Sequence, residues 1–202
     1  HEYEVRMNSP EIFKPFLDRK SMNVIYLGYL WKIPIAILNS NKFNLKGIGL
    51  EHERDYSAIA KKNLSSYKSL FFDAKQINSK FRDMNCFENI DVVFVGGFGQ
   101  LLSKEFLIHP NIGCYNFHTS FLPYYRGNNP IESQFMCGDI NGGITLHRID
   151  EGTDTGEILI QRPYRFRESD HYPDVLEVYH GLFAEIIGSI DEGKIDVFRE
   201  SN

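Results

Sequence analysis

The stretch NFHTSFLPYYRG, from Asn116 to Gly127, places an asparagine and a histidine two residues apart. Because side chains alternate between the two faces of a strand, Asn116 and His118 can point the same way if this stretch is extended. Pro123 interrupts a regular continuation, so both side chains are expected near the end of the strand. An amide and an imidazole held together can polarise a carbonyl group and transfer a proton. The pair therefore predicts chemistry on a carbonyl at a strand end.

An acidic loop that contains glycines follows downstream, in HRIDEGTDTGEIL. From Asp150 to Gly156 it carries three acids and two glycines, and strand-like stretches flank it. Glycine lets the backbone adopt left-handed conformations and lets a flat ligand approach closely. A carboxylate in such a loop can hold a histidine in its charged or correctly oriented form. The loop thus supplies the acid that a histidine-based site needs.

Other roles stay open for these residues when each is taken singly. A lone histidine such as His118 is more often structural than catalytic, and Asn116 could cap a turn. A metal site is disfavoured, and no metal is expected, because no short HxxxH or HxxEH spacing occurs and no cysteine lies in a ligand pair. The side chains that could serve as metal ligands are those of His109, His118, His147, Asp150 and Asp154.

Composition indicates a soluble globular protein. The chain has 202 residues, 42% of them hydrophobic, which suggests one domain or one domain with a small appendage. A net charge of −5 argues against a nucleic-acid partner, because phosphate binding needs dense Lys and Arg on one face. No apolar run approaches the roughly 20 residues of a membrane span. Three unpaired cysteines and no visible secretory signal favour the cytoplasm.

Short apolar runs alternate with amphipathic stretches from Asn23 onward. The expected strands of this half are 23–28, 45–51, 68–73, 90–99 and 113–120, and helices are expected from Leu30 to Ser40, at 55–67 and at 74–87. This alternation predicts βαβ crossovers and an α/β fold with an open, mainly parallel, Rossmann-like twisted sheet flanked by helices. Ligands of such sheets bind at the carboxyl ends of the strands, where 113–120 would deliver His118.

The second half has a different pattern. A helix is expected from Pro130 to Gly138, antiparallel strands at 142–150 and 156–166, and a closing helix at 172–192. Together these elements predict a single catalytic domain over residues 23–202. Residues 1–22 are expected to be an appended or poorly packed lead-in, because Met22 stands directly before the first clear strand.

NFHTSFLPYYRG and RIDEGTDTGEIL together resemble the folate-dependent formyltransferases, and most of all their sugar N-formyltransferase branch. The family motif is Asn-x-His followed by Ser-Leu-Leu-Pro and a glycine, with an aspartate in a glycine-rich loop. Asn116, His118 and Asp154 match the catalytic Asn, His and Asp of that motif, and the 36 residues between the last two are the interval that the family uses. Phe121 departs from the usual leucine, which should affect packing only.

The resemblance implies N10-formyltetrahydrofolate as co-substrate and an amine as acceptor. Attack by the amine would leave negative charge on the formyl oxygen, to which the Asn116 amide and a protonated His118 would donate. Asp154 would favour the imidazolium and help to relay a proton. The pteridine should lie against GQLLSKEFL and the acidic loop, and the residues assigned to it are Gln100, Leu101, Leu102, Asp150, Glu151 and Gly152, although Leu101 and Leu102 could equally be core.

The expected acceptor is the amine of a UDP- or dTDP-linked amino sugar, for bacterial surface glycans such as lipopolysaccharide. The methionyl-tRNA branch adds a carboxyl-terminal barrel and a basic surface, whereas this chain is acidic and stops after one domain. The deformylases carry an extra amino-terminal domain, for which 1–22 leaves no room. In PYYRGNNP, Tyr124 or Tyr125 could stack on a base or sugar and Arg126 could meet phosphate, unless this is an ordinary solvated turn.

Two alternatives stay open. One is a glycinamide ribonucleotide transformylase, although the glycine-rich phosphate loop of that branch is missing: YLGYLWKIP has a single glycine, and VGGFGQLL does not complete GxGxxG. The other is a folate- or nucleotide-binding module without catalysis, which would not need all of Asn116, His118 and Asp154. A homodimer is compatible with the sequence.

Overall fold

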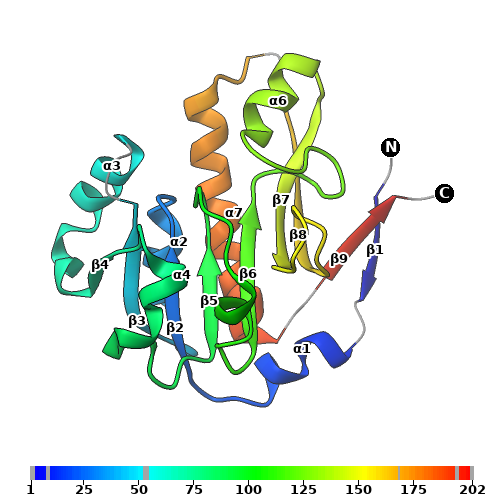
Figure 1. Cartoon of the computed structure of the whole chain (residues 1–202). Helices are drawn as coiled ribbons and strands as arrows, with labels where there is room; N and C mark the ends of the chain where they lie inside the picture. Colours follow the sequence, from blue (N-terminus) through cyan, green and yellow to red (C-terminus); the bar gives the residue numbers. More distant parts are fainter. Residues whose placement is uncertain (1–2, 8–9, 52–54, 168, 194–195, 201–202) are drawn as a thin grey trace. The chain divides into compact units, whose positions relative to one another are not determined.

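The computed structural model describes residues 3–7, 10–51, 55–167, 169–193 and 196–200. It divides into two compact units, one made of residues 20–115 and the other of residues 116–202 together with 1–19 (Figure 1). Each unit is described separately below. Whether residues 23–202 act as one catalytic domain stays a prediction.

Unit 20–115 is built on parallel strands with an apolar core. Its strands are β2 (Met22–Leu27), β3 (Phe43–Leu50), β4 (Phe71–Asp73) and β5 (Val92–Val95). They lie in the order β4-β3-β2-β5, and every neighbouring pair runs parallel. Strands β2 and β5 are buried almost throughout, as is typical of parallel strands covered on both faces. The expected strands and their parallel pairing are confirmed here.

The helical connections of this unit are shorter than expected. They comprise α2 (Lys32–Leu38), α3 (Asp55–Asn63), α4 (Ile77–Lys80) and α5 (Lys104–Leu107), with 3₁₀ turns at Ser65–Leu70, Phe81–Asp83 and Asn85–Phe87. The 3₁₀ turn that ends at Leu70 shortens the predicted strand 68–73 to its last three residues.

The continuous helix predicted at 74–87 is wrong, because the structure has α4 and two 3₁₀ turns there. Phe81 and Phe87 are six residues apart, so in an α-helix their side chains would point about 120° apart around its axis. Both rings are nevertheless buried, and both pack edge-on against Phe106, with ring centroids 5.1 and 5.7 Å away. Burying both aromatic side chains in one cluster therefore requires the chain to turn between them.

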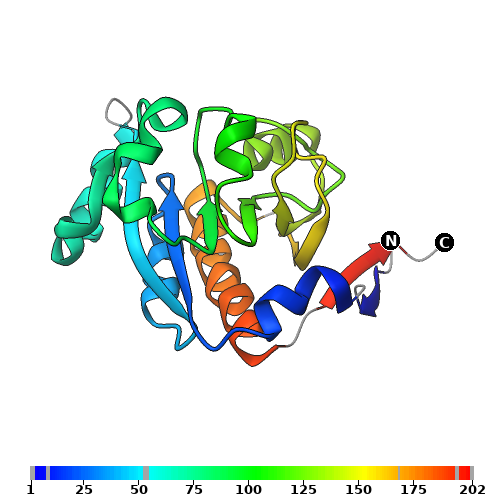
Figure 2. The same cartoon turned by 60° about the horizontal axis from the view of Figure 1, so that its bottom comes forward.

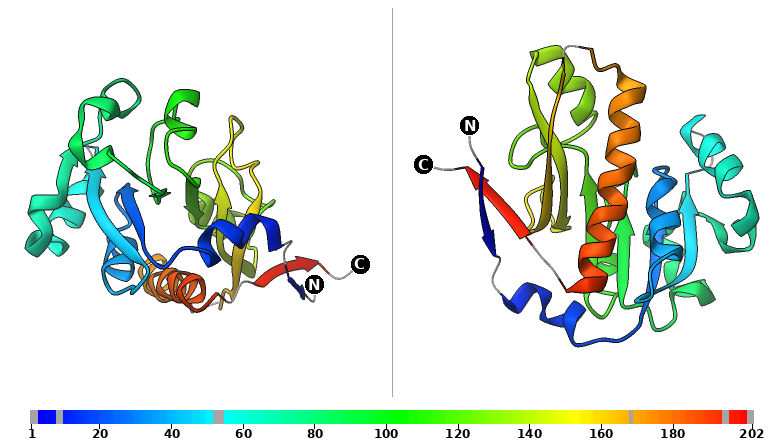
Figure 3. Two further views of the ribbon diagram at one scale, coloured as in Figure 1. Left: turned by 90° about the horizontal axis from the view of Figure 1, so that it is seen from below. Right: turned by 180° about the vertical axis from the view of Figure 1, so that it is seen from behind.

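The other unit combines a hairpin with a long helix. Its elements include β6 (Gly113–His118, which begins in the first unit), α6 (Pro130–Cys137), β7 (Asn141–Arg148), β8 (Ile158–Arg165) and α7 (Tyr172–Glu192). Strands β7 and β8 pair antiparallel, as predicted. Helix α7 lies along both of them (Figure 3, right). Phe183 of α7 packs edge-on against Phe117 of β6 and ties the helix to the strand that carries the candidate site.

Helix α7 has the bounds that the sequence predicts because both of its ends carry local signals. At the start, the Asp174 carboxylate accepts a hydrogen bond from the His171 amide, and proline occupies the first turn. At the end, Gly193 takes a left-handed conformation with φ of +69°, which closes the helix. The apolar residues between these signals recur at helical spacing and are buried.

The two ends of the described chain pair with each other. Strand β1 (Tyr3–Met7) runs antiparallel to β9 (Asp196–Glu200), and the two lie side by side in Figure 2. Between β1 and β2, helix α1 (Pro10–Leu17) buries Phe16 completely. The sequence pattern did not indicate β1 or β9. The interpretation of 1–22 as a lead-in stays a prediction.

Strands β4, β3, β2 and β5 of the first unit are all parallel, and β7 and β8 of the second unit form the antiparallel pair. The predicted fold class, a mainly parallel sheet with antiparallel strands in the C-terminal half and flanking helices, is confirmed. Among the described residues, no helix combines the length and apolar character that crossing a membrane requires.

The backbone contact between Gly28 and Gly96 gives a test of this arrangement. Gly28 has φ of +128°, and a Cβ there would lie 2.0 Å from the Gly96 carbonyl oxygen. Gly28→Ala should therefore lower the free energy of unfolding by at least about 1–3 kcal/mol, measured by urea denaturation. Gly181→Ala is the matched control, since nothing lies within 4 Å of that position in α7. It should raise the same quantity by about 0.5–1 kcal/mol. Equal stability of the two variants would contradict the packing described.

Candidate active site

Strand β6 and the loop between β7 and β8 bring the three predicted catalytic residues together. Asn116 and His118 lie on one face of β6, and Asp154 lies in the loop. Asp154 Oδ2 is 3.5 Å from His118 Nδ1, and Asp154 Oδ1 accepts a hydrogen bond of 3.3 Å from Asn116 Nδ2. All three belong to the same compact unit. The alternation of side chains in an extended strand thus directs both β6 residues to one carboxylate.

Backbone groups of the loop after β6 hold the ring and the carboxylate in place. The Tyr125 carbonyl accepts a hydrogen bond of 2.8 Å from His118 Nε2, and the Gly127 amide donates one of 2.8 Å to Asp154 Oδ2. Gly127 has φ of +92°, a conformation that residues with a Cβ rarely adopt. Asp154 itself has φ of +50°, which aspartate tolerates better than most residues. This local geometry explains why an aspartate and a glycine stand at these positions.

The proton on His118 follows from its neighbours. A carbonyl oxygen can only accept, so Nε2 carries a hydrogen and Nδ1 is the nitrogen that titrates. Burial lowers the pKa of His118 below its usual value of 6.5, although the charge of Asp154 acts in the opposite direction. The ring is therefore mostly neutral at pH 7, with a basic Nδ1 directed at Asp154. The sequence had led us to expect an imidazolium here.

Asp154 stays ionised. Burial by itself would raise its pKa, but the close contact with the His147 ring, the charge of His118 and the hydrogen bond from the Gly127 amide together lower it to about 2. A negative charge therefore stands beside both histidines at neutral pH. It stabilises any proton that Nδ1 of His118 takes up.

His147 is a member of the cluster that the sequence analysis did not assign to it. Its side chain is 2% exposed on β7, and its Nε2 lies 3.3 Å from Asp154 Oδ1 and 3.3 Å from Asn116 Nδ2. Its Nδ1 lies 2.9 Å from the Arg148 carbonyl and must donate to it. The sequence identified His147 only as one of several metal ligands to be weighed. Which residues the His147 side chain contacts depends on how β7 pairs with its neighbouring strands, and the sequence pattern does not give that pairing.

This arrangement occupies the Asn116 amide. Its two hydrogens are directed at Asp154 Oδ1 and, when His147 is neutral, at His147 Nε2. Both contacts are 3.3 Å long and therefore weak. An oxyanion could replace either partner at modest cost. Across the described residues, no group of three His, Cys, Asp or Glu side chains is arranged to hold a metal ion.

The residues predicted to contact the pteridine lie in two places. Gln100, Leu101 and Leu102 belong to unit 20–115, where the Gln100 side chain donates to Glu51 Oε1 and to the Ala74 carbonyl, both at 3.1 Å. Leu101 is 83% exposed, so it is not core, whereas Leu102 is half-buried. An exposed apolar side chain on an ordered backbone suits contact with a flat ring. The role of these residues stays a prediction.

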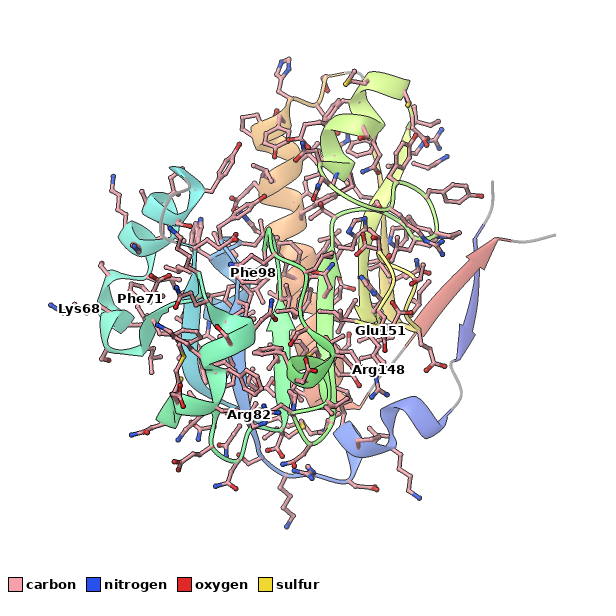
Figure 4. The ribbon with its side chains drawn as sticks, viewed as in Figure 1. Lys68, Phe71, Arg82, Phe98, Arg148 and Glu151 are labelled. Atoms are coloured by element: carbon pink, nitrogen blue, oxygen red, sulfur yellow. The ribbon has the colours of Figure 1, made fainter. Side chains whose placement is uncertain are left out.

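Asp150, Glu151 and Gly152 are exposed at the tip of the β7–β8 hairpin. Asp150 Oδ1 accepts hydrogen bonds from the Gly152 amide at 3.0 Å and from the Thr155 hydroxyl at 2.8 Å, which folds the loop before Asp154. Glu151 of this loop and Arg148, the last residue of β7, are both labelled in Figure 4, and both are exposed. One oxygen of Asp150 thus shapes the loop, and ligand contacts at these residues stay predictions.

The predicted acceptor-binding residues differ in how much surface they offer. Tyr124 is 47% exposed, and Arg126 is exposed. Tyr125 is half-buried, and its hydroxyl donates to Asp139 Oδ2 at 3.0 Å. Burial and this hydrogen bond raise the pKa of Tyr125 to about 12. Tyr124 is therefore the better candidate for stacking, and Tyr125 contributes its carbonyl to His118.

Residues 30–180 match the family model described as Formyl transferase. The chain belongs to this family. The broad resemblance deduced from the Asn-x-His motif and the Asp154 loop is thereby confirmed, while the narrower resemblance to the sugar branch stays a prediction. N10-formyltetrahydrofolate is the formyl donor of the family, in agreement with the predicted co-substrate.

Curated relatives are named methionyl-tRNA formyltransferases. One from Borrelia garinii subsp. bavariensis is 35% identical over 130 residues, which are 64% of this chain and 39% of the relative. Another, from Carboxydothermus hydrogenoformans, is 48% identical over 97 residues, 48% of this chain and 32% of the relative. The chain thus spans between about a third and two fifths of the length of these relatives.

Solved structures share the fold at low identity. Phosphoribosylglycinamide formyltransferase from Streptococcus pneumoniae has a TM-score of 0.67 and 19% identity, with 86% of this chain and 98% of that chain covered. A formyltetrahydrofolate deformylase from Pseudomonas syringae pv. tomato has a TM-score of 0.69 and 15% identity, with 85% and 60% covered. At such identities the comparison shows the fold alone.

The His118–Asp154 contact predicts a specific titration. In a nitrogen-15 NMR titration, His118 should change protonation below pH 6.5 because burial disfavours the imidazolium. Asp154→Asn should move the midpoint lower still, because it removes the charge that raises the pKa of His118. Glu157→Gln, which removes a charge from an exposed residue nearby in the sequence, is the control and should leave the midpoint unchanged. An upward move in Asp154→Asn would refute the assigned electrostatics.

Proposed function

We propose that this chain transfers the formyl group of N10-formyltetrahydrofolate to the amine of a nucleotide-linked amino sugar. The observation that carries formyl transfer is the cluster in which the half-buried Asp154 meets the buried His118 and the half-buried Asn116, within a chain of the formyl transferase family. Formyl transfer to an amine needs a donor for the developing oxyanion and a group that takes the proton of the amine. These three residues are proposed to supply both.

In this mechanism His118 acts first as a base. Its Nδ1 takes the proton that the attacking amine loses, and the ionised Asp154 stabilises the imidazolium that results. His118 then returns the proton to the leaving nitrogen of the folate. A mostly neutral His118 in the resting enzyme suits this order of events, and activity should fall when the pH drops below the pKa of His118.

Asn116 is proposed to stabilise the charge on the formyl oxygen. As that oxygen becomes negative, it accepts a hydrogen from Asn116 Nδ2 in place of one of the two weak contacts described above. Donors of this kind contribute roughly 3–4 kcal/mol in comparable sites. The Asn116 carboxamide keeps its remaining contact and so stays oriented.

Two features support an amino sugar on a UDP or dTDP carrier as acceptor. First, the loop after β6 exposes Tyr124 and Arg126, a ring that can stack and a guanidinium that can bond two phosphate oxygens. Second, β2 is followed by a single glycine and by Tyr29, which stacks on Tyr56 with ring centroids 4.9 Å apart, where a glycine-rich phosphate loop would be needed for glycinamide ribonucleotide.

A second acceptor, methionyl-tRNA, is favoured by a different observation. The curated relatives named above carry that activity in their names and are 35% and 48% identical over the matched segments. Against it stands the net charge of −5, which suits RNA binding poorly. Glycinamide ribonucleotide has weaker support, because the structures with that name show the fold alone.

Substitution of the proposed catalytic residues tests formyl transfer itself. Asn116→Ala, His118→Ala and Asp154→Ala should each lower kcat about a hundredfold or more, because each removes a charge or proton contact made during reaction. Their combinations should cost less than the product of the single effects. His180→Ala, on α7, is a matched control that should keep near-normal turnover. Near-normal turnover by His118→Ala would contradict the proposed mechanism. Folate binding by the wild-type protein without turnover of any acceptor would favour a binding module.

The acceptor is tested by a panel that contains UDP- and dTDP-linked amino sugars, methionyl-tRNA and glycinamide ribonucleotide. We expect the highest kcat/KM with a nucleotide sugar. Arg126→Ala should raise KM for that sugar more than KM for the folate, because it removes a phosphate contact. Arg165→Ala replaces an exposed arginine on β8 and should change neither. Faster turnover of methionyl-tRNA or glycinamide ribonucleotide would show that the proposed acceptor is wrong.

A further inference from the structure

The loop after β6 is bonded to a cluster of polar side chains that the proposed reaction does not use. It consists of Ser120, Thr145 and Gln161, which we call the buried polar cluster. Their exposed fractions are 0%, 0% and 1%. Buried polar groups are costly unless they form hydrogen bonds, so the partners of these side chains indicate why they are retained.

Thr145 of β7 is the centre of this cluster. Its hydroxyl donates to the Ser120 carbonyl at 2.8 Å and accepts from the Leu122 amide at 3.0 Å. It also accepts from Gln161 Nε2 at 3.0 Å. One hydroxyl thus uses its donor and both of its acceptor positions. Two of these bonds go to the backbone of the loop that follows β6.

The side chains of Ser120 and Gln161 donate hydrogen bonds to the same loop. The Ser120 hydroxyl donates to the Tyr124 carbonyl at 2.6 Å, and Gln161 Nε2 also donates to the Leu122 carbonyl at 2.9 Å. The backbone from Ser120 to Tyr124 is therefore held at four polar atoms. The next residue is Tyr125, whose carbonyl accepts from His118 Nε2.

We propose that Thr145 is a positioning residue for the transfer reaction. Through the loop, its hydroxyl holds the Tyr125 carbonyl against His118 and so decides which ring nitrogen carries the hydrogen. Without that carbonyl, His118 is free to place its hydrogen on Nδ1, toward Asp154, and Nδ1 is then no longer the base. The inference rests on the proposed function for its effect on turnover, but not for its effect on the histidine.

Packing alone does not require a hydroxyl at this position. Valine has nearly the shape of threonine and would fill the same buried site on β7. Thr145→Val would leave the Leu122 amide and the Ser120 carbonyl without the partners described, while Gln161 Nε2 keeps the Leu122 carbonyl. The exchange therefore removes the polar connection to the loop and leaves the apolar packing in place.

The test compares Thr145→Val with three variants. Thr145→Ser keeps the hydroxyl, and Tyr179→Phe is the control for stability. Ser120→Ala removes the bonds of the Ser120 hydroxyl to the Tyr124 carbonyl at 2.6 Å and to the Tyr125 carbonyl at 3.5 Å. Tyr179→Phe removes a buried hydrogen bond of the same unit, in which the Tyr179 hydroxyl accepts from the Gly143 amide at 3.2 Å. Nitrogen-15 NMR reports the tautomer and titration midpoint of His118, and steady-state kinetics reports kcat and KM.

Thr145→Val should change the His118 tautomer toward Nδ1–H and lower kcat roughly tenfold or more, with KM for the folate within about twofold. Thr145→Ser should keep the tautomer of His118 and kcat near their wild-type values. Ser120→Ala should change both in the same direction but by less. Tyr179→Phe should change neither, although it loses a similar amount of stability. If Thr145→Val does not fold, Ser120→Ala decides by the same two measurements. If Thr145→Val and Ser120→Ala fold and His118 keeps its wild-type tautomer and titration midpoint in both, the proposal is overturned. This outcome can be measured even if no acceptor is turned over.

Discussion

The candidate site depends on one half-buried carboxylate, that of Asp154. Asp154 lies within 3.5 Å of His118 and within 3.3 Å of His147 and Asn116, and it also accepts from the Gly127 amide. An ionised group in this position is stable only because these neighbours compensate for its burial. Removing the charge would change the protonation of His118 and the orientation of the Asn116 amide together.

The hairpin β7–β8 and the loop after β6 give this carboxylate its surroundings. The loop is held by hydrogen bonds of the Ser120, Thr145 and Gln161 side chains, and its backbone takes left-handed conformations at Tyr125 and Gly127. Its backbone then offers a carbonyl to His118 and an amide to Asp154. The positions of the His118 ring and the Asp154 carboxylate therefore depend on main-chain groups, which substitutions affect only through the side chains that hold the loop.

The reaction and the acceptor rest on different parts of the molecule. The proposal of formyl transfer rests on the cluster at the end of β6 and on membership of the formyl transferase family. The proposed acceptor rests on the exposed residues Tyr124 and Arg126. Families that share one chemistry commonly differ in this outer part, because loops tolerate change better than strands do.

The sequence by itself determined the parallel strands, the antiparallel hairpin, the bounds of α7 and the meeting of Asn116, His118 and Asp154. These features depend on local signals, namely apolar runs, helix caps and the alternation along one strand. Tertiary structure decided the rest. The helix expected at 74–87 breaks because Phe81 and Phe87 are both buried against Phe106, a contact between distant residues. His147 joins the site, and burial lowers the pKa of His118, because strand register and burial are set by the whole fold.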